Sequence, residues 1–303
     1  MDIDERKRFW NTLLLAKDEN DRETLGKLLK IPLRLYRYRP VNNNSLEALK
    51  TNRLFFSSSN YYDDPFDTFI RIDFKKVREI VRQLNGNEAG LNDAYNILKE
   101  VRKNMRENMW SVCFSENSLN ESLWLKYADN YTGFVLEYNV EDISKAIFNV
   151  YSPIQCEPVK KCMNVDMRDS LLPMYYSDEP YDATDYAGFL AKCYLLEKEG
   201  KIQEIKALLD TGVFKWEAER ILLIKKFLHH YDEEWRLLLN TKYKIISGLK
   251  PYKECVPSKI ILGLNMNEDN ELLVIRKAKQ AGIDSVEKMI IDENDELNTV
   301  KVL

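Results

Sequence analysis

The sequence predicts a mixed α+β fold with a central mixed, largely antiparallel sheet, flanking helices and a helical insertion. Short segments of alternating or continuous apolar residues, which are typical of strands, recur along most of the chain. Amphipathic stretches with the period of a helix lie between these segments. A block at about residues 164–228 is mostly helical in pattern and separates strand-like segments on either side. We therefore expect one sheet with helices packed on it.

A helical preface and two strands open the chain. Residues 3–29 place leucines at helical spacing among charged residues. Residues 33–39, LRLYRYR, alternate apolar and polar side chains as a half-buried strand does, which lets Arg37 reach water or a ligand. A helix at 44–50 and a short buried strand at 53–57 follow.

The remaining elements follow from the same patterns. Helices are expected where apolar residues recur every three or four positions, and strands where they alternate or run together. The expected helical segments are 75–109, with a break near NGNEAG at 85–90, and 120–130, 216–228 and 267–282. The expected strands are 110–115, 132–139, 147–162, 233–240, 256–264 and 287–294.

No internal repeat, low-complexity segment or clean domain boundary interrupts this order. The domain prediction is an N-terminal helical preface at 1–30, followed by a single α+β domain at 31–303. The helical insertion at about 164–228 belongs to the second unit.

Composition sets aside several classes of protein. The chain has 303 residues and is 45% hydrophobic, with 45 basic and 49 acidic residues and a formal net charge of -4. This balance argues against a global electrostatic grip on nucleic acid, which we rank last among the partners. No run approaches the ~20 apolar residues of a membrane span, and the start lacks the pattern of a signal peptide. We expect a cytoplasmic protein with no membrane partner.

Cysteine and histidine usage narrows the chemistry. The five cysteines are odd in number and form no CxxC motif, so neither a disulfide framework nor a structural zinc site is expected. Histidine occurs only at His229 and His230, which argues against multi-histidine metal sites and favours chemistry by carboxylates, arginines and tyrosines. No metal is expected.

Four stretches in order resemble one family. They are LYRYRP with SLEALKTNRLFFSSSNYYDDPFD, then WSVCFSENSLNESLWLKYADNYTGFVLEYN, then YDEEWRLLL, and last VPSKIILG. Together they are similar to the bacterial domain-of-unknown-function family 2971, over roughly residues 33–265 apart from 164–212. The chain departs from the usual pattern at Asp63, Leu123, Lys126 and Asp232, where the family has Asn, Met, His and Glu.

The resemblance implies a role but no established activity. An arginine-bearing strand, a serine-rich strand and a late acidic strand look like the R–S–E arrangement of ADP-ribosyltransferases. NAD is then the implied substrate, and a place among phage-defence proteins is a further expectation from the resemblance.

Two residues are the catalytic candidates if the ligand is NAD. Breaking the nicotinamide–ribose bond develops positive charge on the ribose, as in glycoside cleavage, and Glu234 is the candidate to stabilise it. If Trp235 and Leu237 face the core, strand alternation puts Glu234 and Arg236 on the opposite face. Arg37 is the candidate clamp for the pyrophosphate, because a guanidinium offers a planar fork to phosphate oxygens.

The remaining candidates concentrate in the polar loop SSSNYYDDPFD at 57–67, which we interpret as a pocket wall presented by turn chemistry. Serines would orient the ribose or hold the neighbouring strand, and tyrosines would stack on a ring of the ligand. The ligand-binding candidates are Ser57, Ser59, Tyr62, Asp64, Asp67, Tyr127 and Arg236.

Each candidate also has a structural interpretation. Arg37 would pair with Asp64 or Glu234 inside the fold. Lys225 and Lys226 are interpreted first as part of a solvated helix face. Because buried charges need partners, the strands at 33–39 and 233–240 are expected to be neighbours.

Two functions therefore remain open. The first is an ADP-ribosyltransferase-like or NAD-consuming effector. The alternative is a non-catalytic sensor or partner-binding protein of a bacterial defence system, which binds a nucleotide, another small molecule or a protein.

Overall fold

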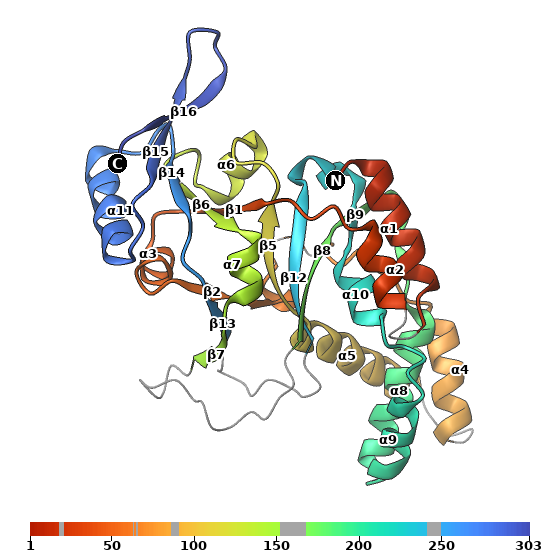
Figure 1. Cartoon of the computed structure of the whole chain (residues 1–303). Coiled ribbons are helices and arrows are strands. Elements are labelled where there is room, and N and C mark those ends of the chain that lie inside the picture. The colour runs from red at the N-terminus through yellow and green to blue at the C-terminus, as the bar shows by residue number, and fades with distance from the viewer. Residues whose placement is uncertain (18–20, 63, 65, 86–90, 152–167, 241–249) are drawn as a thin grey trace.

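A nine-stranded sheet forms the centre of the computed structural model (Figure 1), which describes residues 1–303 except 18–20, 63, 65, 86–90, 152–167 and 241–249. Its strands are β1 (Arg34–Arg39), β3 (Ser57–Ser58), β5 (Trp110–Ser115), β6 (Phe134–Asn139), β8 (Arg168–Pro173), β12 (Glu234–Asn240), β14 (Lys259–Leu262), β15 (Val286–Ile291) and β16 (Leu297–Lys301). They run in the order β16-β15-β14-β6-β1-β5-β12-β8, and β3 pairs with β5 off this path. Only β14 and β15 pair in parallel among these strands, so the predicted mixed, largely antiparallel sheet is confirmed.

Three smaller sheets lie around the central one. The largest joins β2 (Arg53–Phe55), β13 (Lys250–Glu254) and β7 (Phe148–Tyr151) in antiparallel pairs. Two parallel pairs join β4 (Ile70–Arg71) to β10 (Tyr181–Asp182), and β9 (Tyr175–Ser177) to β11 (Ile224–Lys226).

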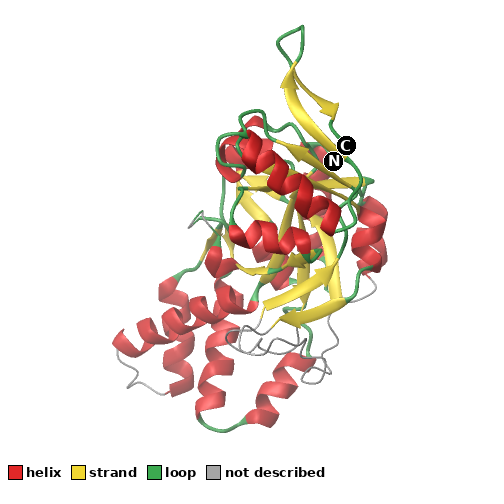
Figure 2. Cartoon of the chain, turned by 90° about the vertical axis from the view of Figure 1, so that its left-hand side faces the viewer, coloured by secondary structure: helices red, strands yellow, loops and turns green. Residues whose placement is uncertain are grey.

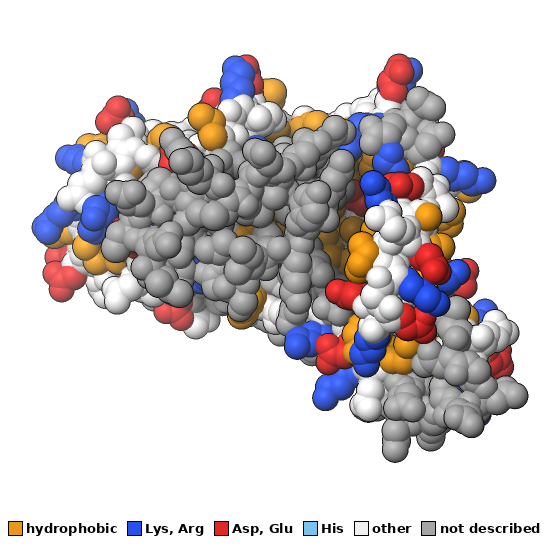
Figure 3. Space-filling view, turned by 90° about the horizontal axis from the view of Figure 1, so that it is seen from below, with side chains coloured by type: hydrophobic (Ala, Val, Ile, Leu, Met, Phe, Trp, Pro, Cys, Tyr) orange, Lys and Arg blue, Asp and Glu red, His pale blue; other side chains and the backbone are white. Residues whose placement is uncertain are grey.

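Helices flank the sheet and also build a separate group. They are α1 (Ile3–Leu15), α2 (Asp21–Leu28), α3 (Asn43–Lys50), α4 (Phe74–Asn85), α5 (Leu91–Asn108), α6 (Glu121–Tyr127), α7 (Val140–Lys145), α8 (Thr184–Lys198), α9 (Ile202–Asp210), α10 (Glu217–Leu222) and α11 (Glu268–Gln280), with 3₁₀ turns η1 (Ser59–Tyr61) and η2 (Phe227–Asp232). Helices α4, α5, α8 and α9 extend away from the sheet and pack on one another (Figures 1 and 2). Seen from below, acidic and basic side chains are interspersed on the described parts of the surface (Figure 3).

Strand alternation divides the core between the two faces of the sheet. Trp235, Leu237 and Leu239 of β12 are buried in one apolar cluster, which α3 and α11 cover. Leu238, from the opposite face, belongs to a second cluster together with side chains of α1, α8 and α10. This alternation confirms that Glu234 and Arg236 lie on the face opposite Trp235.

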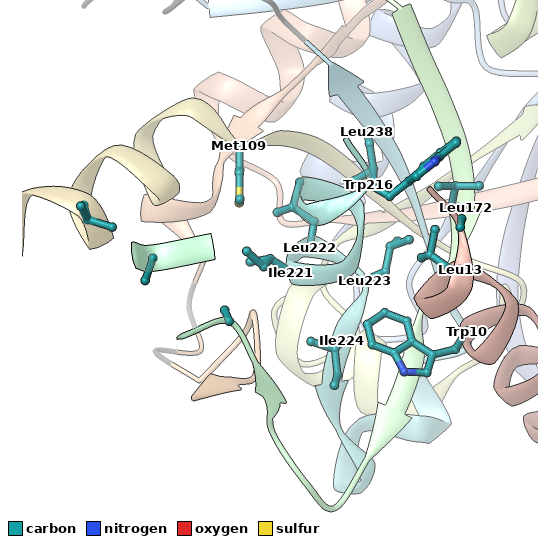
Figure 4. Packing of buried hydrophobic residues seen from close by; sticks show 14 of the residues in the cluster. Trp10, Leu13, Met109, Leu172, Trp216, Ile221, Leu222, Leu223, Ile224 and Leu238 are labelled. Atoms are coloured by element: carbon teal, nitrogen blue, oxygen red, sulfur yellow. The ribbon is translucent and has the colours of Figure 1, made fainter. Parts of the chain in front are cut away.

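The N-terminal helix is part of the main core rather than a separate preface. Trp10 and Leu13 pack against residues from β8, α10 and β11 (Figure 4). Burial of side chains of this size contributes about 1.5–3 kcal/mol each. The guanidinium of Arg220 donates to the carbonyl oxygens of Leu13 at 2.9 Å and Ala16 at 2.7 Å, which satisfies orphan acceptors at the end of α1.

The segment at 164–228 is less helical than its pattern predicts. Helices α8, α9 and α10 lie in it, but its described part also contains β8, an edge strand of the central sheet, and the short strands β9, β10 and β11. The expected helix at 216–228 stops at Leu222, and β11 and η2 follow. Of the expected strand at 147–162, β7 forms at Phe148–Tyr151, and residues 152–162 lie outside the described residues.

The order of the sheet corrects one expectation. Strands β1 and β12 are not neighbours, because β5 lies between them and pairs with both. Local sequence pattern identifies the two strands, whereas their pairing depends on contacts between distant segments.

The tight approach of Gly133 to the neighbouring backbone leads to a stability test. A Cβ at this position would lie 2.2 Å from the carbonyl oxygen of Arg39 and 2.8 Å from that of Ala128. Gly133→Ala should therefore lower the free energy of unfolding by about 1–3 kcal/mol, as overpacking of a rigid site does. Chemical denaturation followed by circular dichroism measures the change.

Gly26→Ala is the matched control, because no neighbouring atom of the described residues lies within 4 Å of a Cβ built at Gly26 in α2. Alanine there should raise stability by about 0.5–1 kcal/mol through helix propensity. Equal stability changes in the two variants would contradict the close packing at Gly133.

Candidate functional site

A fork in the central sheet creates the candidate site. Along one edge of β5, Ser115 pairs with Tyr36 of β1, whereas Ser111 and Trp110 pair with Ser57 and Ser58 of β3. Strand β1 therefore leaves β5 beyond Tyr36, and β3 takes its place farther along. Between the two pairings lies a pocket of about 300 Å³. Its lining includes side chains from β1, β5, α6, η2, β12 and the loop that follows β3.

One wall of the pocket is an ion network centred on Glu234. Its carboxylate accepts from Nε of Arg236 at 2.6 Å and from Nζ of Lys225 at 2.9 Å. Arg236 also binds both carboxylate oxygens of Asp67, at 2.8 and 2.7 Å, and Lys225 binds Asp232 at 2.9 Å. The guanidinium of Arg236 thus links the polar loop to β12.

The charges of this network determine its protonation states. Burial alone raises the pKa of Glu234, but Arg236 and Lys225 outweigh it and hold that pKa well below its usual range. Burial likewise acts to lower the pKa of Lys225, and the carboxylates of Glu234, Asp67 and Asp232 outweigh it and raise that pKa. Glu234 is consequently a permanent carboxylate at neutral pH, suited to electrostatic stabilisation rather than to proton donation.

The second wall carries two arginines of β1. Arg37 and Arg39 are half-buried and both line the pocket. Burial, and then the neighbouring charge of Arg39, lower the pKa of Arg37 to about 9, so its guanidinium remains charged at neutral pH. Within the described ranges, no carboxylate lies within ion-pair distance of either arginine; Arg37 donates to the carbonyl oxygen of Phe55 at 3.4 Å.

Arg37 and Glu234 share the pocket without touching. Arg37 is the register partner of Leu136 in β6, whose side chain lies in the cluster with Trp235. Glu234 is the partner of Ser115 and therefore lies on the other face of the sheet. Residues of both faces are among the lining of the pocket. Among the described residues, Arg37 forms neither of its two expected ion pairs, with Asp64 or with Glu234.

Some residues of the polar loop line the pocket, and others support the fold. Ser57, Tyr62, Asp64 and Asp67 line the pocket, as the sequence interpretation of a pocket wall requires. Ser59 does not, because its hydroxyl donates to the carbonyl oxygen of Arg106 in α5 at 3.0 Å. Residues 63 and 65 of the loop lie outside the described part of the chain.

Two further predicted site residues, Tyr127 and Arg236, differ from each other in whether they line the pocket. Tyr127 of α6 lines the pocket. Arg236 has 0% exposure and lies behind Asp67 and Glu234, so it positions the two carboxylates instead of meeting a ligand. Its guanidinium also lies 4.8 Å from the ring centroid of Tyr62.

Sequence reasoning missed several members of the site. Lys225 is only 3% exposed and belongs to the network, so its interpretation as part of a solvated helix face was wrong. His229 lies with Nε2 3.1 Å from a carboxylate oxygen of Asp64, at the turn that leads into β12. Arg39 could have been found, because it follows Arg37 at the spacing that puts both on one face of a strand.

Cys113 lies at the centre of the fork but is a poor nucleophile. It lines the pocket between the pairings of β5 with β1 and β3. Burial, and then the nearby charge of Glu234, raise the pKa of its thiol to about 12. Since the thiolate is the reactive form, the site is not built for cysteine chemistry.

A larger hollow of about 930 Å³ opens beside the start of α1 and η2. Its lining includes Arg6, Asn120 and His230, but it includes neither the arginines of β1 nor the ion network of Glu234. We therefore place the candidate site in the smaller pocket, where charges of both signs and tyrosines converge.

Comparison of the chain with protein-family models, with curated proteins and with solved structures produced no match. The similarity to family 2971 accordingly stays a prediction.

In the described part of the chain, no three or more histidine, cysteine, aspartate or glutamate side chains are grouped to hold a metal ion. None of the helices in those ranges combines the length and apolar character needed to cross a membrane.

The two arginine positions should respond differently to substitution. Arg236→Met leaves Asp67 and Glu234 as buried carboxylates without their main partner, so we expect a loss of about 3–5 kcal/mol in unfolding free energy. Arg37→Met should change it by less than about 1 kcal/mol, because no carboxylate of the described residues pairs with that guanidinium. Urea denaturation of both variants measures the difference.

Adding Asp67→Asn to Arg236→Met removes one of the stranded charges. The double variant should recover part of the lost stability, which is the signature of coupling between contacting residues. If Arg37→Met proves as destabilising as Arg236→Met, Arg37 is a structural residue and the assignment of the second wall is wrong.

Alkylation of Cys113 tests the electrostatics of the pocket. With its pKa raised to about 12, the thiol should react with iodoacetamide far more slowly at pH 8 than free cysteine does. The rate should rise with pH toward that value, because thiolate forms only as the pH approaches the pKa. Peptide mass spectrometry reports the rate, and Glu234→Gln should accelerate labelling at pH 8.

Proposed function

We propose that the pocket in the forked sheet binds a phosphate-bearing nucleotide, with NAD as the leading candidate, and that the protein is an ADP-ribosyltransferase-like or NAD-consuming enzyme. One observation carries the proposal. Two arginines without a carboxylate partner in the described chain face the same small cavity as a permanent carboxylate, with tyrosines around them.

The anionic part of the ligand would bind at the arginine wall. Guanidinium groups recognise phosphate oxygens through paired charge-assisted hydrogen bonds. Burial, and then the like charge of Arg39, lower the pKa of Arg37, and a bound anion would compensate the charge of both guanidinium groups. A volume of about 300 Å³ lies at the small end of ligand pockets, which suits one nucleoside half of NAD with the rest extending outside.

The sugar and base would occupy the space between the walls. Tyr62 and Tyr127 offer rings for stacking, and Ser57 offers a hydroxyl toward a ribose. Glu234 would stabilise positive charge that develops on the ribose as the bond to nicotinamide breaks. Nicotinamide leaves with the bonding electrons, water or a target nucleophile takes its place, and the nucleophile's proton passes to solvent.

A second function is favoured by the ion pairs that the acidic residues of the pocket form. Glu234, Asp67 and Asp232 are all held by Arg236 or Lys225, which leaves none of them as a general base. Such a wall also suits a nucleotide sensor that binds without reaction. In both forms the resemblance to family 2971 supports a role in bacterial phage defence, where protein partners would read the outcome.

Incubation of the purified protein with NAD separates these functions. Calorimetry measures binding, and chromatography measures release of nicotinamide, with and without cell lysate as a source of targets. The enzyme proposal expects nicotinamide release that Glu234→Gln abolishes while binding stays within a few-fold. Binding without release supports the sensor, and absence of binding by NAD, ADP-ribose and AMP contradicts both.

Arginine variants test the proposed anion wall. Arg37→Met should weaken nucleotide binding about tenfold or more, the effect of one lost charge-assisted hydrogen bond. Arg34→Met is the matched control on the same strand, because Arg34 is exposed and lies outside the pocket. Equal weakening by both variants would mean that only the net charge of the protein matters.

A further inference from the structure

We propose that a second cavity, on the other side of the polar loop, binds a small amphipathic anion with an aliphatic body and a carboxylate end. The cavity has a volume of about 430 Å³. It lies between residues 66–72, the second half of α5 and the start of β10, and it shares no lining residue with the nucleotide pocket.

Apolar atoms form about half of the surface of this cavity, and polar atoms form the rest. Most of its lining side chains are aromatic or aliphatic, and several also pack against the main core. They are Phe66, Phe69, Ile70, Ile72, Met109, Pro180 and Ile221. Figure 4 shows Met109 and Ile221 at this side of the core. An apolar lining with a few polar groups is the usual composition of a small-molecule site.

Charge selects the sign of the ligand. Arg102 and Arg106 lie four residues apart in α5, so both guanidinium groups belong to the same face of the helix. None of the described lining residues carries a carboxylate. A neutral or cationic ligand would leave the exposed charge of Arg102 without a counterpart in the cavity, whereas a carboxylate would complement it.

The backbone conformation of Thr68 is an independent observation at the same cavity. Thr68 lines the cavity at φ 63°, a conformation that is rare for a β-branched side chain. Its backbone N–H bonds the carboxylate of Asp67 at 2.8 Å, the same carboxylate that holds Arg236. Strained backbone of this kind concentrates at binding and switch sites.

Calorimetric titration with octanoate tests the proposal in the absence of any nucleotide, so its result does not depend on the function of the first pocket. The wild-type protein should bind octanoate at one site and should not bind octylamine there. Arg102→Ala should weaken octanoate binding about tenfold or more. Lys99→Ala, also exposed on α5 but outside the lining, should stay within about twofold of wild type.

Filling the cavity provides a second measurement. Ile70→Trp should abolish octanoate binding, and saturation-transfer NMR should show contacts from the methylene chain of octanoate to the wild-type protein. If Ile70→Trp does not fold, the comparison of Arg102→Ala with Lys99→Ala still decides. The proposal is overturned if wild type does not bind millimolar octanoate, or if the two α5 variants bind it equally.

Discussion

The buried guanidinium of Arg236 is the constraint on which the site depends. It joins β12 to the polar loop through Asp67, fixes Glu234 from the side, and donates to the carbonyl oxygen of Leu222 at the end of α10 at 2.6 Å. A fully desolvated charge is costly unless every donor finds a partner. The positions of the loop, the acidic strand and the helix end are therefore set together, which gives the pocket a rigid wall.

The contrast between the two walls explains why the cavity is suited to a ligand. On the acidic side, Glu234, Asp67 and Asp232 are each bound by Arg236 or Lys225. On the β1 side, Arg37 and Arg39 lie next to each other with lowered pKa values, and the described protein supplies no compensating acid. The uncompensated positive charge of the pocket is thus concentrated on one wall, where the proposed anionic ligand would bind.

Sequence pattern predicted the elements better than their neighbours. Alternation in β12 correctly separated Trp235 from Glu234. The fork, the position of β5 between β1 and β12, and the burial of Lys225 could not be predicted from sequence pattern. Strand pairing and charge burial depend on contacts between distant segments. Of the pocket, the loop and both charged strands were identified, whereas Ser59 and Arg236 serve the fold behind it.

The shared wall between the two cavities has an evolutionary consequence. Asp67 faces one hollow and Thr68 the next, and a single peptide bond joins them. Selection on either hollow then restricts what the other can become, since a shift of this peptide moves both linings. Positions on the two sides of Thr68 should covary among relatives although their side chains never meet.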